Sequence, residues 1–343
     1  MKYPRPLEKG SRIAVTAFSS GVCAPFHQRL DIVKSHLLSL GFEVVEGQCL
    51  RHDAGHVSAS AEQRAQELMQ FLCDETIAAI APPWGGEFAM DVLPLLDYEK
   101  LKTVEPKWLF GFSDVSTLSV ALTSKLGWST AHSPNLMEMH PSETDALTAK
   151  TLHWLTLSEG SHFSQKSSDY YQLSGSSFAT HPNATLNKTE PSSWKILGTD
   201  NGLVFSGRLV GGCFDTLLHL VGTDYFDIET LRNQYRDDGI ILYLENAEMS
   251  PTVLKRSLQG FKNKGVFDDL KGFLFGRNAV TDNCGKDISS REAFVEVAES
   301  LNIPIVYDVD IGHLPPNMTL LNGAYAEVRV NAGKGEIKQT LKP

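Results

Sequence analysis

Strand-like and helix-like segments alternate with short connections over residues 11–130, and this alternation constrains the fold more than any other feature. Four apolar runs have the length of buried strands and precede segments with helical spacing: "RIAVTAF", "FEVVEG", "IAAIAPP" and "KWLFGF". Such alternation predicts a parallel sheet covered by helices. We therefore expect residues 1–140 to form an open, mostly parallel α/β domain that binds ligands at the C-terminal ends of its strands.

The character of the sequence changes in the middle of the chain. Residues 141–200 are rich in Ser, Thr, Asn and Gly and have little periodicity, so we expect a linker with a mobile substrate loop. Alternation returns in residues 201–343, where "GIILYLE" and "GFLFG" are typical of buried strands and "SREAFVEVAESLN" of a helix. A chain of 343 residues is long enough for the two domains that this division predicts.

Charge and cysteine content argue against several classes of function. The formal charge is −10 and Lys and Arg form no cluster, so we expect no nucleic-acid partner and no membrane surface. The five cysteines are scattered without a CxxC pair, which predicts neither a disulfide framework nor a metal site. The N-terminus lacks the apolar core of a signal peptide, and no apolar stretch reaches the roughly 18 residues of a membrane helix. The sequence thus predicts a cytoplasmic protein.

Ser113 stands where the apolar run "KWLFGF" gives way to a helix-like segment. A serine at the start of a helix is most often an N-cap. However, Gly111 leaves room for a sharp turn, and the backbone N–H of Asp114 follows directly, as in the nucleophile elbow of the α/β-hydrolases. Val115 occupies the place of the second glycine of that motif, so both interpretations of Ser113 stay open on these residues alone.

A serine nucleophile requires a base and an acid that orients the base. Glu245 ends an apolar strand at the edge where ligands collect, and His313 follows another strand between a glycine and a Pro-Pro loop. The alternatives are a salt bridge for Glu245 and a structural capping role for His313. Gly85 and Gly86 follow a third strand and can turn backbone N–H groups toward a cleft as an oxyanion hole, although a tight turn explains them equally well.

In this order, the Gly-Gly loop, "GFSD", "GRLVGG", the strand ending in Glu and the final "GH" resemble the LD-carboxypeptidase family of serine peptidases, which includes the microcin C immunity proteins. The resemblance implies a Ser113–Glu245–His313 triad and an oxyanion hole of N–H groups from the Gly85–Gly86 loop and Asp114. It also implies a site between an N-terminal α/β domain and a strand-rich, sandwich- or barrel-like C-terminal domain with helices. A homodimer is usual in the family, and no cofactor is implied.

The family has two branches, and three residues bear on the choice between them. Trp194 matches a tryptophan that stacks on the nucleobase in the immunity branch, or else it anchors its loop to the core. Cys213 stands where the family commonly has Asn, and Trp84 where the peptidase branch usually has Arg. We expect all three to contact substrate. The missing Arg favours the immunity-like branch.

The immunity-like branch cleaves an amide in aminoacyl- or peptidyl-nucleotides of the microcin C type and so detoxifies them. The alternative is a murein LD-carboxypeptidase that releases terminal D-Ala from tetrapeptides during peptidoglycan recycling. A non-catalytic small-molecule binding protein is a further alternative, since an open α/β domain joined to a second domain also describes solute receptors. A dinucleotide-dependent oxidoreductase is excluded, because the first strand is followed by "FSSG" and not by GxGxxG.

Overall fold

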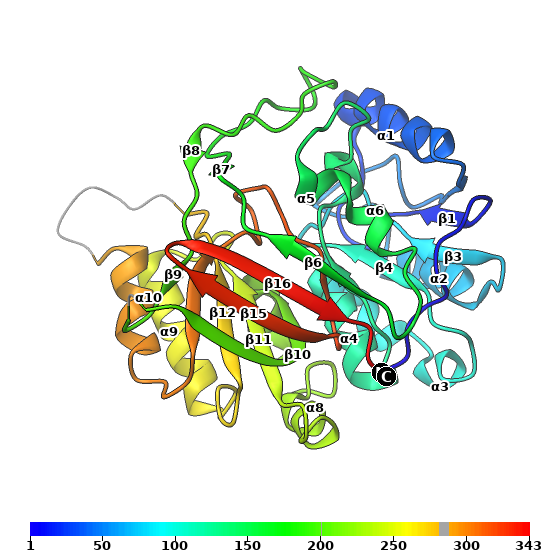
Figure 1. Ribbon diagram of the computed structural model, residues 1–343. Coiled ribbons are helices and arrows are strands. Elements are labelled where there is room, and N and C mark those ends of the chain that lie inside the picture. Colours follow the sequence, from blue (N-terminus) through cyan, green and yellow to red (C-terminus); the bar gives the residue numbers. More distant parts are fainter. Residues whose placement is uncertain (200, 281–287) are drawn as a thin grey trace.

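A computed structural model describes residues 1–199, 201–280 and 288–343, which form two lobes, each built on one large sheet (Figure 1). The sheet of the N-terminal lobe has the strand order β14-β5-β4-β3-β1-β2. All its pairings are parallel except that of β14 with β5, so the predicted open, mostly parallel α/β sheet is confirmed. Its strands are β1 (Arg12–Val15), β2 (Glu43–Glu46), β3 (Ile77–Ile80), β4 (Trp108–Gly111), β5 (Ala131–His132) and β14 (Leu320–Leu321).

Helices flank this sheet and are delimited by local signals. The helix α2 begins at a capping box of Ser60 with Gln63, and α4 ends at Gly127 in the left-handed conformation that favours glycine. Nearly all of α4 is buried because it lies between the sheet and elements of the C-terminal lobe. The helical segments are η1 (Ala24–Phe26), α1 (His27–Ser39), α2 (Ala61–Cys73), η2 (Ala89–Leu95), α3 (Tyr98–Leu101), α4 (Val115–Leu126) and η3 (Leu136–Glu138).

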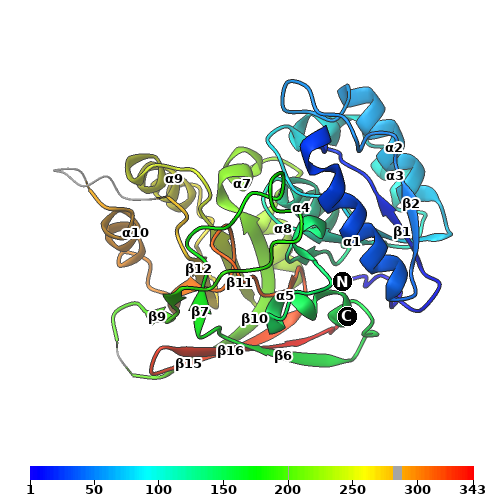
Figure 2. The same cartoon turned by 90° about the horizontal axis from the view of Figure 1, so that it is seen from above.

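The C-terminal lobe is rich in strands, as predicted, and its strands form one mixed sheet in the order β6-β16-β15-β10-β11-β12-β13-β9. The strands from β10 to β13 are parallel and completely or largely buried, and helices cover one side of them (Figure 2). These strands are β10 (Leu203–Cys213), β11 (Ile240–Glu245), β12 (Gly272–Gly276), β13 (Ile305–Val309), β15 (Tyr325–Asn331) and β16 (Lys334–Thr340). The helices are α7 (Phe214–Leu220), α8 (Ile228–Gln234), α9 (Pro251–Asn263) and α10 (Ser290–Ala298).

Residues 141–199 supply strands to both edges of the C-terminal sheet. Strand β6 pairs with β16, and β9 pairs with β13. Between them, β7 and β8 pair with each other, and the loop that joins them reaches from the C-terminal lobe to α1 of the N-terminal lobe (Figure 1). We call residues 170–191 the arm. The elements are α5 (Ala146–Ala149), α6 (Thr151–Trp154), β6 (His162–Lys166), β7 (Tyr170–Tyr171), β8 (Glu190–Pro191) and β9 (Lys195–Ile196).

Two further features are the character of the helices and the state of the cysteines. Among the described residues, no helix has the length and apolar character needed to cross a bilayer. The cysteines Cys23, Cys49, Cys73 and Cys213 are free thiols, whereas Cys284 lies outside the described residues.

Candidate active site

Ser113 occupies a sharp turn between β4 and α4. Its φ is +63°, a left-handed conformation that costs a non-glycine residue about 1–3 kcal/mol. Gly111 permits the turn, because a Cβ atom there would lie 2.4 Å from Oδ1 of Asn135. The N-cap position of α4 is occupied by Asp114, so Ser113 is not the cap. The strained turn favours the nucleophile-elbow interpretation of Ser113.

Glu245 and His313 meet Ser113 from the other lobe. Glu245 is the last residue of β11 and is fully buried, and His313 lies in the loop after β13. Nδ1 of His313 is 2.8 Å from Oε2 of Glu245, and Nε2 is 3.1 Å from Oγ of Ser113. With its proton on Nδ1, His313 donates to Glu245 and accepts from the Ser113 hydroxyl group. The structure therefore brings the three predicted residues into one hydrogen-bonded chain.

The electrostatics of His313 and Glu245 are coupled. Burial alone would raise the pKa of Glu245, but the adjacent His313 outweighs burial and holds this pKa below its ordinary value. Burial alone would lower the pKa of His313, but the Glu245 carboxylate raises it above its ordinary value. Glu245 thus stabilises the imidazolium that forms when His313 takes up a proton.

Two glycines make room for the Glu245 side chain. A Cβ atom at Gly312 would lie 2.5 Å from Oε2 of Glu245, and one at Gly276 would lie 2.8 Å from its Cβ. Oε1 of Glu245 and both ring nitrogens of buried His132 have no hydrogen-bond partner among the described residues. Burial lowers the pKa of His132 to about 4, so its ring is neutral at pH 7.

The Gly-Gly loop lies directly against Ser113. A Cβ atom at Gly85 would lie 2.6 Å from the backbone nitrogen of Asp114 and 2.9 Å from Oγ of Ser113. In the part of the chain that the structure describes, the N–H groups of Gly85, Gly86 and Asp114 donate no hydrogen bond. Free N–H groups beside the serine are what an oxyanion hole requires.

The sequence matches two profiles of known families in the two lobes that carry these residues. The LD-carboxypeptidase N-terminal domain matches residues 13–133, and the LD-carboxypeptidase C-terminal domain matches residues 206–328. The chain belongs to the LD-carboxypeptidase family of serine peptidases. The resemblance inferred from the motifs is thereby confirmed.

Relatives match almost the whole chain. The microcin C7 self-immunity protein MccF of Escherichia coli is 25% identical over 92% of this chain and 89% of its own length. The probable murein peptide carboxypeptidase of Bacillus subtilis (strain 168) is 26% identical over 94% of this chain and 90% of its own. The structure of MccF in complex with aspartyl sulfamoyl adenosine superposes with a TM-score of 0.83 over 99% of both chains, at 22% identity. The fold is thus that of MccF.

Trp84, Trp194 and Cys213 are the three residues expected to contact substrate. Of these, only Trp84 is partly exposed. Its indole N–H donates to the carbonyl of Gly21 at 3.2 Å, and its ring meets Phe26 edge to face. Trp194 is only 2% exposed and its indole donates to Asp310, which favours the alternative that Trp194 anchors its segment to the core; its contact with substrate stays a prediction.

The Cys213 side chain is also buried, with only 1% of it exposed, and its contact with substrate stays a prediction. It is the register partner of Glu245 in the parallel pair of β10 and β11. Burial raises the pKa of the Cys213 thiol well above its ordinary value, so the thiol is protonated at neutral pH. Cys213 therefore packs beside Glu245 and is no nucleophile.

Three side chains near the site were missed by the sequence reasoning. The Asp114 carboxylate accepts from Oγ of Ser19 at 2.5 Å and the N–H of Ala89 at 2.8 Å, which ties the Gly-Gly loop region to the elbow. Asn135 accepts from the N–H of Phe112, and its capping box with Glu138 was visible in the sequence as "NLME". Asp310 gave no local signal. Among the described residues, no group of three or more His, Cys, Asp or Glu side chains is arranged to hold a metal.

Proposed function

We propose that the protein is a serine amidohydrolase in which Ser113 is the nucleophile, His313 the general base and Glu245 the acid that orients His313. The observation that carries this proposal is the hydrogen-bonded chain of 2.8 Å and 3.1 Å through the two ring nitrogens of His313. The strained conformation of Ser113 supports it, since stored backbone strain is common at catalytic residues.

In the proposed reaction, Oγ of Ser113 bonds to the carbonyl carbon of an amide while its proton passes to Nε2 of His313. The carbonyl oxygen becomes an oxyanion and accepts from N–H groups of the Gly85–Gly86 loop and Asp114. Each such donor contributes about 3–4 kcal/mol of transition-state stabilisation. His313 then protonates the leaving nitrogen as the C–N bond breaks, and water attacks the acyl-enzyme in the second half of the cycle.

We propose aminoacyl- or peptidyl-nucleotides of the microcin C type as substrates, so that hydrolysis gives immunity by detoxification. The similarity to MccF over nearly the whole chain supports this class, as does the complex of that protein with aspartyl sulfamoyl adenosine. The second candidate is release of terminal D-Ala from murein tetrapeptides. The B. subtilis relative, a probable murein peptide carboxypeptidase of comparable similarity, supports that alternative.

We further propose that the protein works as a cytoplasmic homodimer, as the family resemblance implies. Sedimentation velocity at micromolar concentration tests this: a single species with twice the mass of 37.8 kDa is expected, and a monomer contradicts it.

The test of the reaction compares hydrolysis by the wild type and Ser113→Ala on two compounds. One is aspartyl sulfamoyl adenosine, and the other is a murein tetrapeptide that ends in D-Ala. Cleavage of the adenosine compound, reduced on the order of 10⁵-fold or more in Ser113→Ala, is the expected result. Release of D-Ala alone would assign the protein to murein recycling. Equal cleavage by wild type and Ser113→Ala would contradict the proposed mechanism.

A further inference from the structure

Asp310 is fully buried and lies three residues before His313. Its carboxylate accepts hydrogen bonds from the N–H and the hydroxyl group of Ser168 at 2.9 and 2.5 Å. It also accepts from the indole of Trp194 at 2.8 Å and from Nη1 of Arg277 at 2.6 Å. A carboxylate so deeply buried is tolerated only when donors surround it, so these three residues are required together.

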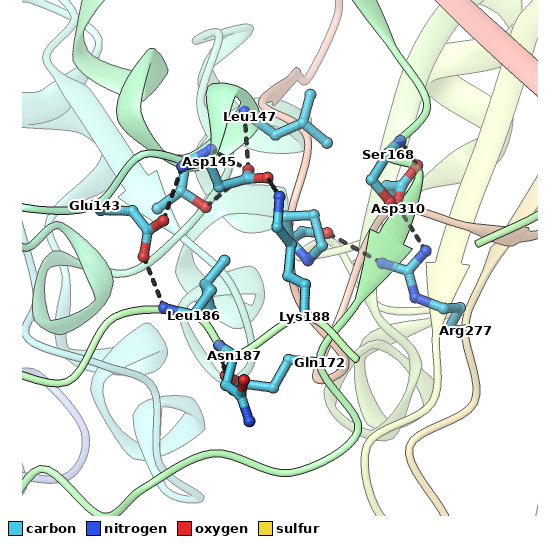
Figure 3. Close-up of polar contacts among 12 residues, drawn as sticks. Glu143, Asp145, Leu147, Ser168, Gln172, Leu186, Asn187, Lys188, Arg277 and Asp310 are labelled. Carbon is cyan, nitrogen blue, oxygen red and sulfur yellow. Dashed lines mark hydrogen bonds and ion pairs between the residues drawn. The ribbon is translucent and has the colours of Figure 1, made fainter. Parts of the chain in front are cut away.

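Two of the donors to Asp310 lie on either side of the arm. Ser168 precedes β7, as Figure 3 shows, and Trp194 follows β8, so one carboxylate holds the segments that flank the arm. The middle of the arm reaches α1 of the N-terminal lobe, where Arg29 donates to the carbonyl of Pro182 at 2.9 Å. Nearer to β8, Lys188 pairs with Asp145, the residue before α5, at 2.5 Å (Figure 3). The arm therefore spans the two lobes whose residues meet in the proposed triad.

Buried Arg29 of α1 strengthens the attachment of the arm to the N-terminal lobe. Its guanidinium group donates to the carbonyls of Pro182 and Ala184 at 2.9 and 2.8 Å and lies over the ring of Phe178. The N–H of Leu186 donates to the Glu143 carboxylate at 2.8 Å nearby (Figure 3).

The same ion pair clamps the loop on the other side of His313. Arg277, held by Asp310, also donates to the carbonyls of Leu314 at 2.8 Å and Pro316 at 3.1 Å. The arm touches this loop directly, because the N–H of Gln172 donates to the carbonyl of Pro315 at 2.8 Å. The segment that carries His313 is thus fixed before and after the histidine by groups that also hold the arm.

We propose that Asp310 is a positioning residue that couples the arm to His313. The contacts of the arm with the N-terminal lobe fix the positions of Ser168 and Trp194. These two residues position Asp310, and Asp310 in turn sets the distance between His313 and Ser113. Asp310 touches no reacting atom in this scheme. The inference rests on the proposed roles of Ser113 and His313.

An alkyl fluorophosphonate tests the coupling without knowledge of the natural substrate. Oγ of Ser113 bonds to phosphorus, fluoride leaves, and the hydroxyl proton passes to His313, so the labelling rate reports the geometry of this pair. Asp310→Asn risks failure to fold, so the test uses Trp194→Phe and Ser168→Ala, which each remove one donor. Trp128→Phe is the matched control: Trp128 is equally buried, and its indole N–H has no partner among the described residues.

We expect Trp194→Phe and Ser168→Ala each to label about tenfold more slowly than the wild type, since misplacement of a catalytic group costs rate. The midpoint of the pH–rate curve should move to lower pH, because His313 is held less closely against the Glu245 carboxylate. Trp128→Phe should change neither quantity. A merely structural role for Asp310 would lower the melting temperature and leave the pH midpoint unchanged.

A double-mutant cycle tests the transmission from the arm. Lys188→Gln removes the ion pair with Asp145, a contact that involves neither Asp310 nor the loop that carries His313, and should slow labelling about two- to threefold in the wild type. In the Ser168→Ala/Trp194→Phe variant it should have no further effect, because the connection is already broken. If labelling depends on Ser113 but Trp194→Phe and Ser168→Ala both keep the wild-type rate and pH midpoint, the coupling alone is overturned. If the wild type and Ser113→Ala both fail to label, or label at equal rates, the proposed triad is overturned, and the coupling with it.

Discussion

Ser113 and His313 face each other across 3.1 Å, yet the chain holds them by different means. The turn at Ser113 is shaped within one lobe, where Phe112 donates to Asn135 only 23 residues away. The loop at His313 depends on Asp310, whose partners Ser168 and Trp194 are 142 and 116 residues away.

This difference has a mechanical consequence. The proposed nucleophile is constrained by a strained turn and close backbone contacts within one lobe. The proposed base is constrained by side-chain hydrogen bonds that join segments distant in sequence. Substitutions in the N-terminal lobe should therefore act on the chemistry directly, and substitutions in the C-terminal lobe should act on the placement and charge of His313.

The largest effect is expected for Glu245→Gln. This substitution tests the claim that residues of the C-terminal lobe act on the placement and charge of His313. Loss of the carboxylate removes the group that raises the pKa of His313 and orients its ring, so kcat should fall about 10³- to 10⁴-fold. With His313 as the proposed base, activity should rise as pH increases through the pKa of His313. The acid limb of kcat/KM should therefore move to lower pH in Glu245→Gln. The exposed Glu248→Gln is the control, and an unmoved acid limb in Glu245→Gln would contradict the assigned pair.

A smaller but still large effect is expected for Gly85→Ala in the N-terminal lobe. The added Cβ would lie 2.6 Å from the nitrogen of Asp114 and 2.9 Å from Oγ of Ser113, so it would displace the proposed oxyanion donors. We expect kcat to fall about 10²- to 10³-fold with little change in the acid limb. Gly260→Ala in α9, where an added Cβ meets nothing within 4 Å, should leave kcat unchanged. A shifted acid limb in Gly85→Ala would show that the nucleophile side is not independent of His313.

The smallest effect concerns the strain at Ser113. Glycine adopts a φ of +63° without cost, so Ser113→Gly should raise the free energy of unfolding by about 1 kcal/mol relative to Ser113→Ala. Urea denaturation measures the difference. In the last turn of α4, Ser124→Gly should be less stable than Ser124→Ala by about 0.5–1 kcal/mol, the opposite sign. Equal stability of the two Ser113 variants would remove the argument from strain.

The turn at Ser113 could be predicted from the sequence, whereas the long-range contacts that hold the loop of His313 could not. Gly111 and the apolar strand lie directly before Ser113, and the Gly85–Gly86 loop follows an apolar strand of its own. Glu245 and His313 were found because each follows an apolar strand, and parallel strands end at one edge.

Trp194 and Asp310 show why the long-range contacts could not be predicted from the sequence. Trp194 lies in the polar stretch "EPSSWK", which is typical of an exposed loop. Its ring is covered by Gly335 of β16, where an added Cβ would lie 1.9 Å from the indole. Neither that contact nor the contacts of Asp310 with Ser168 and Trp194 leave a periodic signal, because they join segments more than a hundred residues apart. The burial of Cys213 also has no local signal in the sequence, because it depends on the position of β10 in the middle of a mixed sheet.

Strand β14 has a consequence for how the protein is made. This strand, Leu320–Leu321, follows His313 in the chain but completes the edge of the N-terminal sheet beside β5, the neighbour of the strand that leads to Ser113. On the ribosome, the sheet that presents Ser113 stays one strand short until almost the whole polypeptide has emerged. Hydrolytic capacity should arise only at the end of translation, and a prematurely terminated chain should be inert toward its substrate.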